Sequence, residues 1–129
     1  MITPFFNNKL KVKYYNIYDD YQPDWINIRD KICENTKAIM MVHYFGHPQP
    51  IEKFISFANK YKLRLIEDNA HGHGGIYKGK MLGTFGDIGF SSPRKLFPLY
   101  SGGCLYHNLI EKVDIKIESP SYRLIFKRI

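Results

Sequence analysis

The sequence lacks several features that mark specialised classes of protein. No apolar run reaches the roughly 20 residues that a membrane-spanning helix needs. The first residues, MITPFFNNKLKVK, do not show the basic, apolar and small-residue order of a signal peptide. Only two cysteines are present, Cys33 and Cys104, and they lie far apart without metal-ligand spacing. We therefore expect a cytoplasmic protein outside the membrane, with reduced thiols.

An excess of acidic residues is also absent, since the 129 residues carry a formal net charge of +7. Such a charge would suit nucleic acid or another polyanion. However, the lysines are scattered except in the tail SYRLIFKRI, and the chain has neither an Arg-rich helix nor an aromatic RNA-binding signature. A solvated basic surface is the favoured interpretation. We expect no nucleic-acid partner, and a phosphate-bearing ligand would suit the same charge.

The chain is long enough for one domain with a sizeable core. Amphipathic spacing predicts helices within residues 20–32, where Asp24 is a candidate N-cap, and over residues 51–62. Alternating strands and helices indicate an α/β fold, a mostly parallel β-sheet with flanking helices and right-handed crossovers. Strand-like composition is found in five segments: residues 11–17, 36–44, 63–68, 86–92 and 102–108.

The second of these strands, residues 36–44, is a continuous apolar run, which predicts burial on both faces. In parallel sheets ligands bind beyond the carboxyl ends of the strands. The segment IEDNAHGHGG, residues 66–75, lies at such an end. Asp68 closes a buried-looking run, so its carboxylate needs a partner. That partner could be a helix N-terminus, a local Arg or Lys, or a ligand cation.

Lys95 follows the strand predicted at 86–92, in a loop rich in Pro and Ser. Most lysines are surface charges, but a lysine beside a ligand pocket can become a nucleophile toward carbonyl compounds. Pyridoxal phosphate (PLP) needs a lysine for a Schiff base, an acid near its pyridinium nitrogen, and donors for its phosphate. Asp68, Lys95 and the pair Ser91 and Ser92 supply these residue types, so the combination predicts PLP chemistry.

Residues 36–106 resemble the DegT/DnrJ/StrS sugar aminotransferases, which are fold type I PLP enzymes. The resemblance depends on VHYFG, IEDNAHGHGG, YKG, G-x-x-GDIG, a Ser shortly before a Lys, and GG after it. The ordered set is specific, although none of its members is specific alone. Toward Met1 the resemblance is looser.

The resemblance implies roles for four residues. Lys95 would be the catalytic residue, the Schiff-base lysine that also moves a proton at the substrate α-carbon. Asp68 would pair with the pyridinium nitrogen, and His71 would contact the cofactor ring or its phenolic oxygen. Ser92 would bind the cofactor phosphate. Some relatives carry His in place of the lysine and act as dehydratases, and Lys95 argues against that branch.

The loop before the lysine departs from the family pattern, because the common spacing from Ser to Lys is longer. Alignment through GDIG without gaps favours Ser92, with Ser91 as the alternative. Some relatives share the short loop, so we do not interpret it as a loss of function.

Histidines near Asp68 allow a second interpretation, a metal site. His71 and His73 could chelate, with His43 or His47 completing the ligand set. The family pattern explains these positions without a metal, so no metal is expected. His73 would then be structural, while His43 and Gly46 would form the floor of the cleft.

The resemblance covers the central part of the large domain only. We expect residues 1–129 to form a single partial domain of the aspartate aminotransferase-like PLP-binding type, with about 110–129 as a divergent tail. Family members are considerably longer, and the parts without a counterpart here supply phosphate contacts and a small domain that closes over substrate.

The implied reaction transfers an amino group from an amino acid, with glutamate expected, to a keto-sugar nucleotide. Its products serve surface-polysaccharide or amino-sugar biosynthesis. Full-length relatives are homodimers with the active site at the subunit boundary. We expect the isolated short chain to be a poor or inactive catalyst. The alternative is a non-catalytic fragment that acts as a structural or partner-binding subunit, completed by a separately encoded chain.

Overall fold

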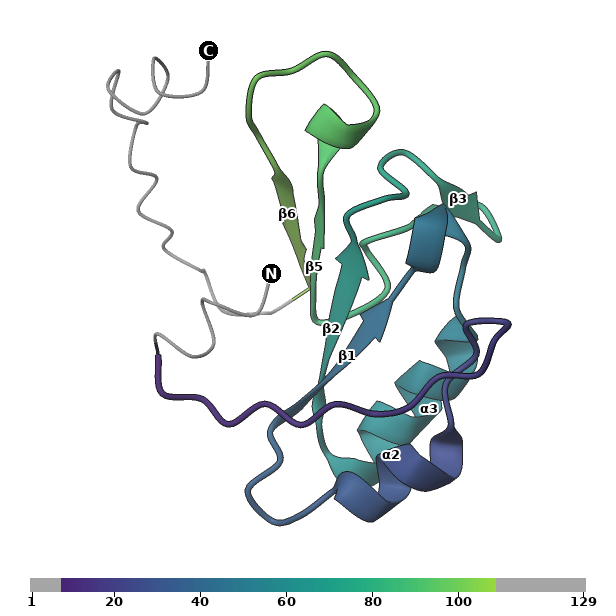
Figure 1. The fold of residues 1–129 in the computed structure, drawn as a ribbon, viewed down its shortest axis with the longest axis vertical. Coiled ribbons are helices and arrows are strands. Elements are labelled where there is room, and N and C mark those ends of the chain that lie inside the picture. The colour runs from purple at the N-terminus through teal and green to yellow at the C-terminus, as the bar shows by residue number, and fades with distance from the viewer. Residues whose placement is uncertain (1–7, 109–129) are drawn as a thin grey trace.

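A computed structural model describes residues 8–108 (Figure 1). The tail expected at about 110–129 lies outside these residues. Helices and 3-10 turns within the described part are α2 (Trp25–Lys31), η1 (Tyr44–Gly46), α3 (Ile51–Tyr61) and η2 (Pro93–Lys95). The strands are β1 (Ala38–Val42), β2 (Arg64–Asn69), β3 (Ile76–Tyr77), β4 (Lys80–Met81), β5 (Ile88–Ser91) and β6 (Cys104–His107).

The main sheet has the strand order β1-β2-β5-β6. β1 pairs with β2 and β2 with β5 in parallel, whereas β5 pairs with β6 in antiparallel fashion. A separate antiparallel hairpin, β3-β4, lies in the connection from β2 to β5. The predicted α/β fold with a mostly parallel sheet is therefore confirmed.

The strand predicted at residues 11–17 is wrong. This segment makes only an isolated bridge, between Ile17 and Pro23. Its Tyr15 packs against the core instead, because its ring contacts Phe54 and its hydroxyl donates a hydrogen bond to the carbonyl of Met40 at 2.8 Å. Strand-forming composition cannot make a strand where no neighbouring strand supplies hydrogen bonds.

Both predicted helices are confirmed. The Asp24 side chain caps α2 by accepting hydrogen bonds from the backbone amides of Ile26 and Asn27, each at 3.0 Å. In α3 the apolar face buries Ile51, Phe54 and Ala58. Helix α3 ends at Lys62, which adopts the left-handed conformation of a C-cap. None of the described helices is long and apolar enough to cross a membrane.

Helix α3 packs on β1 and β2, and α2 contacts α3 through Trp25, whose ring lies against Phe54 and Phe57 (Figure 1). The core forms between these elements. Ile39 and Met41 of β1 point into this core, whereas Met40 and Val42, which alternate with them, are only partly buried. Burial of β1 on both faces, expected from its sequence, is therefore wrong within the described part. Complete burial of a side chain such as Met41 contributes about 2 kcal/mol relative to exposure.

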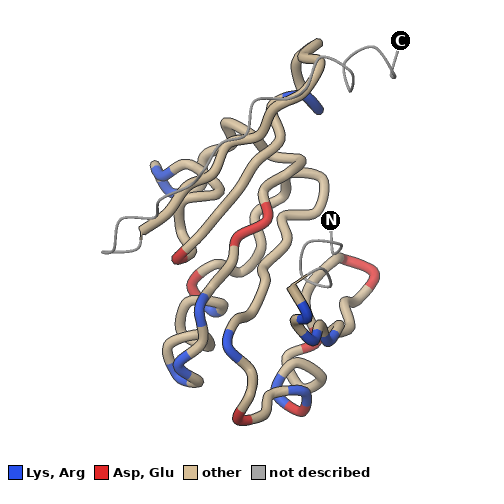
Figure 2. The backbone as a smooth tube through the Cα atoms, turned by 90° about the vertical axis from the view of Figure 1, so that its left-hand side faces the viewer, with Lys and Arg blue, Asp and Glu red and all other residues tan. Residues whose placement is uncertain are grey.

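Basic residues are spread over many segments of the backbone rather than gathered along one face (Figure 2). This distribution agrees with the interpretation of the positive net charge as a solvated surface. Two acidic residues, Glu67 and Asp68, are buried instead, at the end of β2.

Candidate functional site

Three parallel strands end at the same edge of the sheet, and the candidate residues lie there. Val42, Asp68 and Phe90 are in register across β1, β2 and β5. The segments that leave these strand ends therefore emerge side by side. They carry His71 after β2, and Ser92 and Lys95 after β5, so the tertiary structure brings all four predicted site residues to one edge.

The Asp68 carboxylate is buried but incompletely paired. Its exposed fraction is 5%, and one oxygen accepts a hydrogen bond from the Ala70 amide at 3.0 Å. No other described residue donates to it. Burial raises the pKa of Asp68 above its ordinary value, and the Ala70 amide, Lys95 and nearby histidines offset only part of that effect. Among the described residues, the Asp68 carboxylate caps no helix and has no ion pair within hydrogen-bond distance, so it retains capacity for a further donor.

Lys95 lies in the short turn η2, exposed to solvent. Its charge acts on the Asp68 carboxyl group, so the two residues are neighbours rather than on opposite sides of the molecule. Beside η2 is a hollow of about 570 Å³. The hollow is lined by Ala70, Phe90, Ser91, Ser92, Arg94, Lys95, Gly103, Cys104 and Leu105.

The register of the sheet separates the two serines. Ser91 pairs with Asn69, so it faces the opposite side of the sheet from Asp68. Its hydroxyl is already engaged by His73 Nδ1 at 2.8 Å and by the Tyr106 hydroxyl at 3.0 Å. Ser92, which follows β5, is partly exposed and lines the hollow, which favours Ser92 over Ser91 as the phosphate-binding residue. His73 has the structural contact that was expected of it.

His71 lies in the turn after β2, with its ring 5.8 Å from the Phe45 ring. Phe45 has a φ of 54°, in the left-handed region that non-glycine residues rarely adopt. A Cβ atom at Gly72 would lie 2.9 Å from the Cα atom of Gly46. The turn after β1 and the turn after β2 are thus pressed together, and only glycine at position 72 permits this approach.

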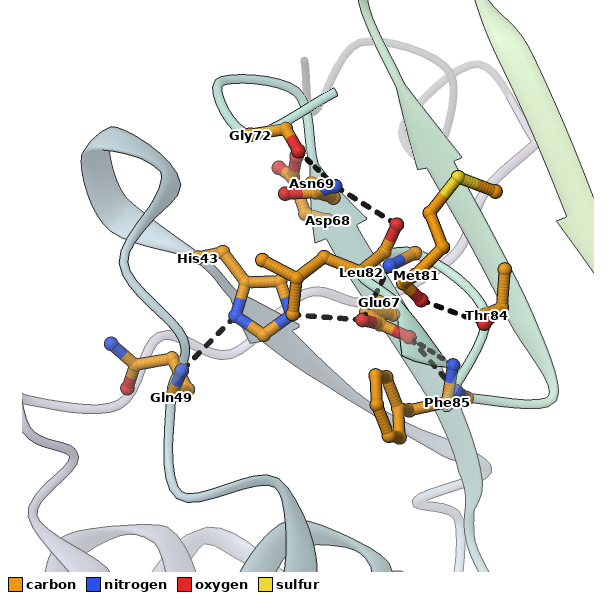
Figure 3. A network of polar contacts seen from close by, with 12 residues as sticks. His43, Gln49, Glu67, Asp68, Asn69, Gly72, Met81, Leu82, Thr84 and Phe85 are labelled. Carbon is orange, nitrogen blue, oxygen red and sulfur yellow. Dashed lines mark hydrogen bonds and ion pairs between the residues drawn. The ribbon is translucent and has the colours of Figure 1, made fainter. Parts of the chain in front are cut away.

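Glu67, next to Asp68 in β2, is a buried carboxylate that received no role from the sequence (Figure 3). One carboxylate oxygen accepts from His43 Nε2 at 2.9 Å and the Gly83 amide at 2.6 Å. The other accepts from the amides of Phe85 at 2.6 Å and Gly86 at 3.0 Å. Burial alone would raise the pKa of Glu67, but these hydrogen bonds outweigh it and hold the pKa below its ordinary value.

His43 is buried beneath the site and does not form a cleft floor. Its Nδ1 accepts a hydrogen bond from the Gln49 amide at 3.1 Å, so Nε2 carries the proton that it donates to Glu67. The ring is therefore neutral. Among residues 8–108, no three His, Cys, Asp or Glu side chains are grouped as a metal ion requires.

PLP fits the residues that are present. A buried carboxylate with a raised pKa suits a cationic ring nitrogen. The positive charge of Lys95 lowers the pKa of this carboxyl group, so Lys95 lies near it. Ser92 and Arg94 beside the hollow are of the types that bind phosphate.

The fold and the edge of the sheet define an α/β protein whose polar residues converge at the carboxyl ends of parallel strands, as in cofactor-binding domains. Residues 6–114 match the model of the DegT/DnrJ/EryC1/StrS aminotransferase family. The chain belongs to this family, whose members are PLP-dependent sugar aminotransferases, some of them dehydratases.

Similar proteins act on nucleotide-linked sugars. The chain is 47% identical over 72 residues to the dTDP-3-amino-3,6-dideoxy-alpha-D-galactopyranose transaminase of Aneurinibacillus thermoaerophilus, covering 55% of this chain and 20% of the relative. The E. coli GDP-4-keto-6-deoxy-D-mannose-3-dehydratase with bound hydrated PLP superposes with a TM-score of 0.70 at 26% identity, covering 81% of this chain and 28% of that one.

A third similar protein supports the fold alone. Helicobacter pylori PseC, an aminotransferase of pseudaminic acid biosynthesis by its description, superposes with a TM-score of 0.74 at 24% identity. The match covers 84% of this chain and 30% of PseC. The chain thus spans about 20–30% of the length of these relatives.

Proposed function

We propose that this chain is the central cofactor-binding part of a PLP-dependent aminotransferase that acts on a keto-sugar nucleotide. The observation that carries the proposal is the buried, incompletely paired Asp68 carboxylate with Lys95 close by at the edge of a parallel sheet. Family membership supports the same chemistry.

When bound, PLP supplies the reactive carbonyl carbon and the electron-accepting ring that transamination requires. In the proposal, Asp68 holds the proton on the ring nitrogen, which offsets the cost of burying its own charge. Lys95 would hold the cofactor through its amine and would carry a proton to and from the substrate α-carbon. Ser92 donates to the phosphate. His71 contacts the ring, held in place by its neighbour Phe45.

The relatives support the class of sugar substrate in this proposal. Similar proteins include transaminases and dehydratases of dTDP- and GDP-linked sugars, so a nucleotide-linked keto-sugar is the proposed acceptor. Glutamate is the proposed donor. The remaining contacts to phosphate and substrate would come from parts of the relatives that have no counterpart here. We therefore expect little transamination from the isolated chain, and either a homodimer or a complementing chain to complete the site.

A trapping experiment tests the proposal. The purified chain is mixed with PLP, reduced with borohydride, and mapped by peptide mass spectrometry. We expect the pyridoxyl group on Lys95 in preference to other lysines, lost in Lys95→Ala and strongly reduced in Asp68→Ala. The matched control is Lys37→Ala. It removes an exposed lysine just before β1, at the opposite end of the strand from the site, and should leave the label on Lys95 unchanged.

Label spread evenly over surface lysines would contradict the proposal. It would instead favour a non-catalytic fragment with an inherited motif. A transamination assay with the pure chain, a glutamate donor and a keto-sugar nucleotide measures how much activity the described part supports by itself.

A further inference from the structure

The buried carboxylate of Glu67 holds together segments that are distant in the chain. Three of its four hydrogen-bond donors are backbone amides within residues 83–86. This segment belongs to no strand or helix, so these amides depend on Glu67 as their acceptor. The fourth donor is the ring of His43.

The segment 83–86 lies directly beneath β5. A Cβ atom at Gly89 in β5 would overlap the carbonyl oxygen of Gly83. The other side of the segment is fixed by Asn108, which donates to the carbonyls of Thr84 and Gly86, each at 2.7 Å. The position of β5, and hence of the residues that follow it, therefore depends on the segment that Glu67 holds.

On its other side, Glu67 acts through His43. The ring donates to Glu67 and accepts from the Gln49 amide, so it joins β2 to both ends of the turn after β1. That turn contains Gly46, which is in close contact with Gly72. The placement of the segment that carries His71 therefore depends on the same carboxylate.

We infer that Glu67 is a positioning residue for cofactor binding. It faces away from the site, but it fixes the turn beside His71 and the support beneath β5, which leads to Ser92 and Lys95. Because His43 is neutral, Glu67 and His43 do not form an ion pair. The Glu67 carboxylate is the only charge among these groups, and hydrogen bonds connect it to both segments. The expected effect on cofactor binding rests on the proposed function, whereas the link between the two loops rests on the hydrogen bonds of Glu67.

The side-chain chemistry explains why glutamate is required. A carboxylate offers only acceptors, and all four groups around it are donors. In Glu67→Gln the amide group replaces one oxygen and places donor against donor, at either the His43–Gly83 side or the Phe85–Gly86 side. The substitution keeps the size of the side chain and removes one half of the link.

The test combines amide hydrogen exchange by NMR with PLP trapping on the full 129-residue chain. In Glu67→Gln we expect faster exchange either of the Gln49 and Gly83 amides or of the Phe85 and Gly86 amides, according to the side on which the new amide group lies. We also expect label on Lys95 to fall about tenfold relative to surface lysines, because small displacements of reacting groups have effects of this size or larger. Glu52→Gln is the matched control at an exposed carboxylate.

A spectroscopic readout separates positioning from general loss of structure. The absorbance of the Lys95-bound cofactor is titrated against pH in the folded protein. A displaced Lys95 or Asp68 shifts the midpoint, whereas a site that is intact but less stable retains it. We expect a shifted midpoint in Glu67→Gln and the wild-type midpoint in Glu52→Gln.

The inference requires both faster amide exchange and weaker labelling of Lys95, and either effect without the other overturns it. Faster exchange with unchanged labelling and midpoint would make Glu67 structural only, and reduced labelling with unchanged exchange would exclude the link through these segments. If Glu67→Gln does not fold, Glu67→Asp, which keeps the charge but withdraws it by one methylene group, is judged by the same criteria. If the wild-type chain takes no label on Lys95, the proposed function fails, and faster exchange at Gln49 and Gly83, or at Phe85 and Gly86, alone decides the structural link.

Discussion

The two carboxylates at the end of β2 are adjacent in the chain and face opposite sides of the sheet. Glu67 is surrounded by four hydrogen-bond donors, and its pKa lies below the ordinary value. Asp68 receives one hydrogen bond from the described residues, and its pKa is raised by burial. Both are buried, so burial does not distinguish them. The number of donors does, and it separates a completed structural group from one that still has capacity for a ligand.

The largest expected effect is on the side of Glu67. In Gly89→Ala the new methyl group would overlap the Gly83 carbonyl beneath β5. Overpacking of this kind costs about 3 kcal/mol. Urea unfolding followed by circular dichroism measures it. Gly103→Ala is the control, because its nearest neighbour, the Ser91 carbonyl, lies 3.4 Å from the added Cβ atom. Equal stability of the two variants would show that β5 does not rest on this segment.

The direct comparison exchanges each carboxylate for its amide. Glu67→Gln leaves buried donors facing a donor, which costs about 2–3 kcal/mol of unfolding free energy. Asp68→Asn keeps the acceptor for the Ala70 amide and removes a buried charge, so stability stays within about 1 kcal/mol of wild type or rises. Chemical denaturation of both variants at neutral pH measures the difference. Comparable losses in both would contradict the contrast between the two groups.

The same contrast predicts opposite dependences on pH. The folded pKa of Glu67 is depressed, so its contribution to stability is present above its unfolded pKa and is lost as the pH falls through the folded value. The folded pKa of Asp68 is raised, so its ionisation costs stability at neutral pH, and this cost disappears as the pH falls.

Unfolding measured from neutral to acidic pH therefore separates the two. The deficit of Glu67→Gln and the advantage of Asp68→Asn should both be largest at neutral pH and shrink toward acid. A constant difference in either variant would show that ionisation of that carboxylate is not linked to folding.

The smallest expected effect concerns the serine that faces away from Asp68. Ser91→Ala removes hydrogen bonds to His73 and Tyr106, which should cost about 1 kcal/mol. It should leave PLP labelling of Lys95 in place, whereas Ser92→Ala should weaken it. Thermal unfolding and the trapping assay give the two readouts. Stronger loss of label in Ser91→Ala would reverse the assignment of the two serines.

Local patterns predicted much of the fold because their causes are local. The cap at Asp24 and the apolar face of α3 follow from spacing alone. The strand expected at 11–17 was wrong because strands depend on partners, and no strand of the described sheet lies beside that segment. The burial of β1 on both faces was wrong for a related reason, since coverage depends on where helices pack.

The sequence by itself determined the α/β class, the family resemblance, and the candidates Asp68, His71, Ser92 and Lys95. These follow from residue types, order and spacing along the chain. Only the tertiary structure decided which carboxylate is complete, that the Ser91 hydroxyl is already engaged, and that Glu67 joins two loops. Those properties depend on strand register and on backbone amides supplied by residues 16 to 19 positions away, which one-dimensional spacing does not specify.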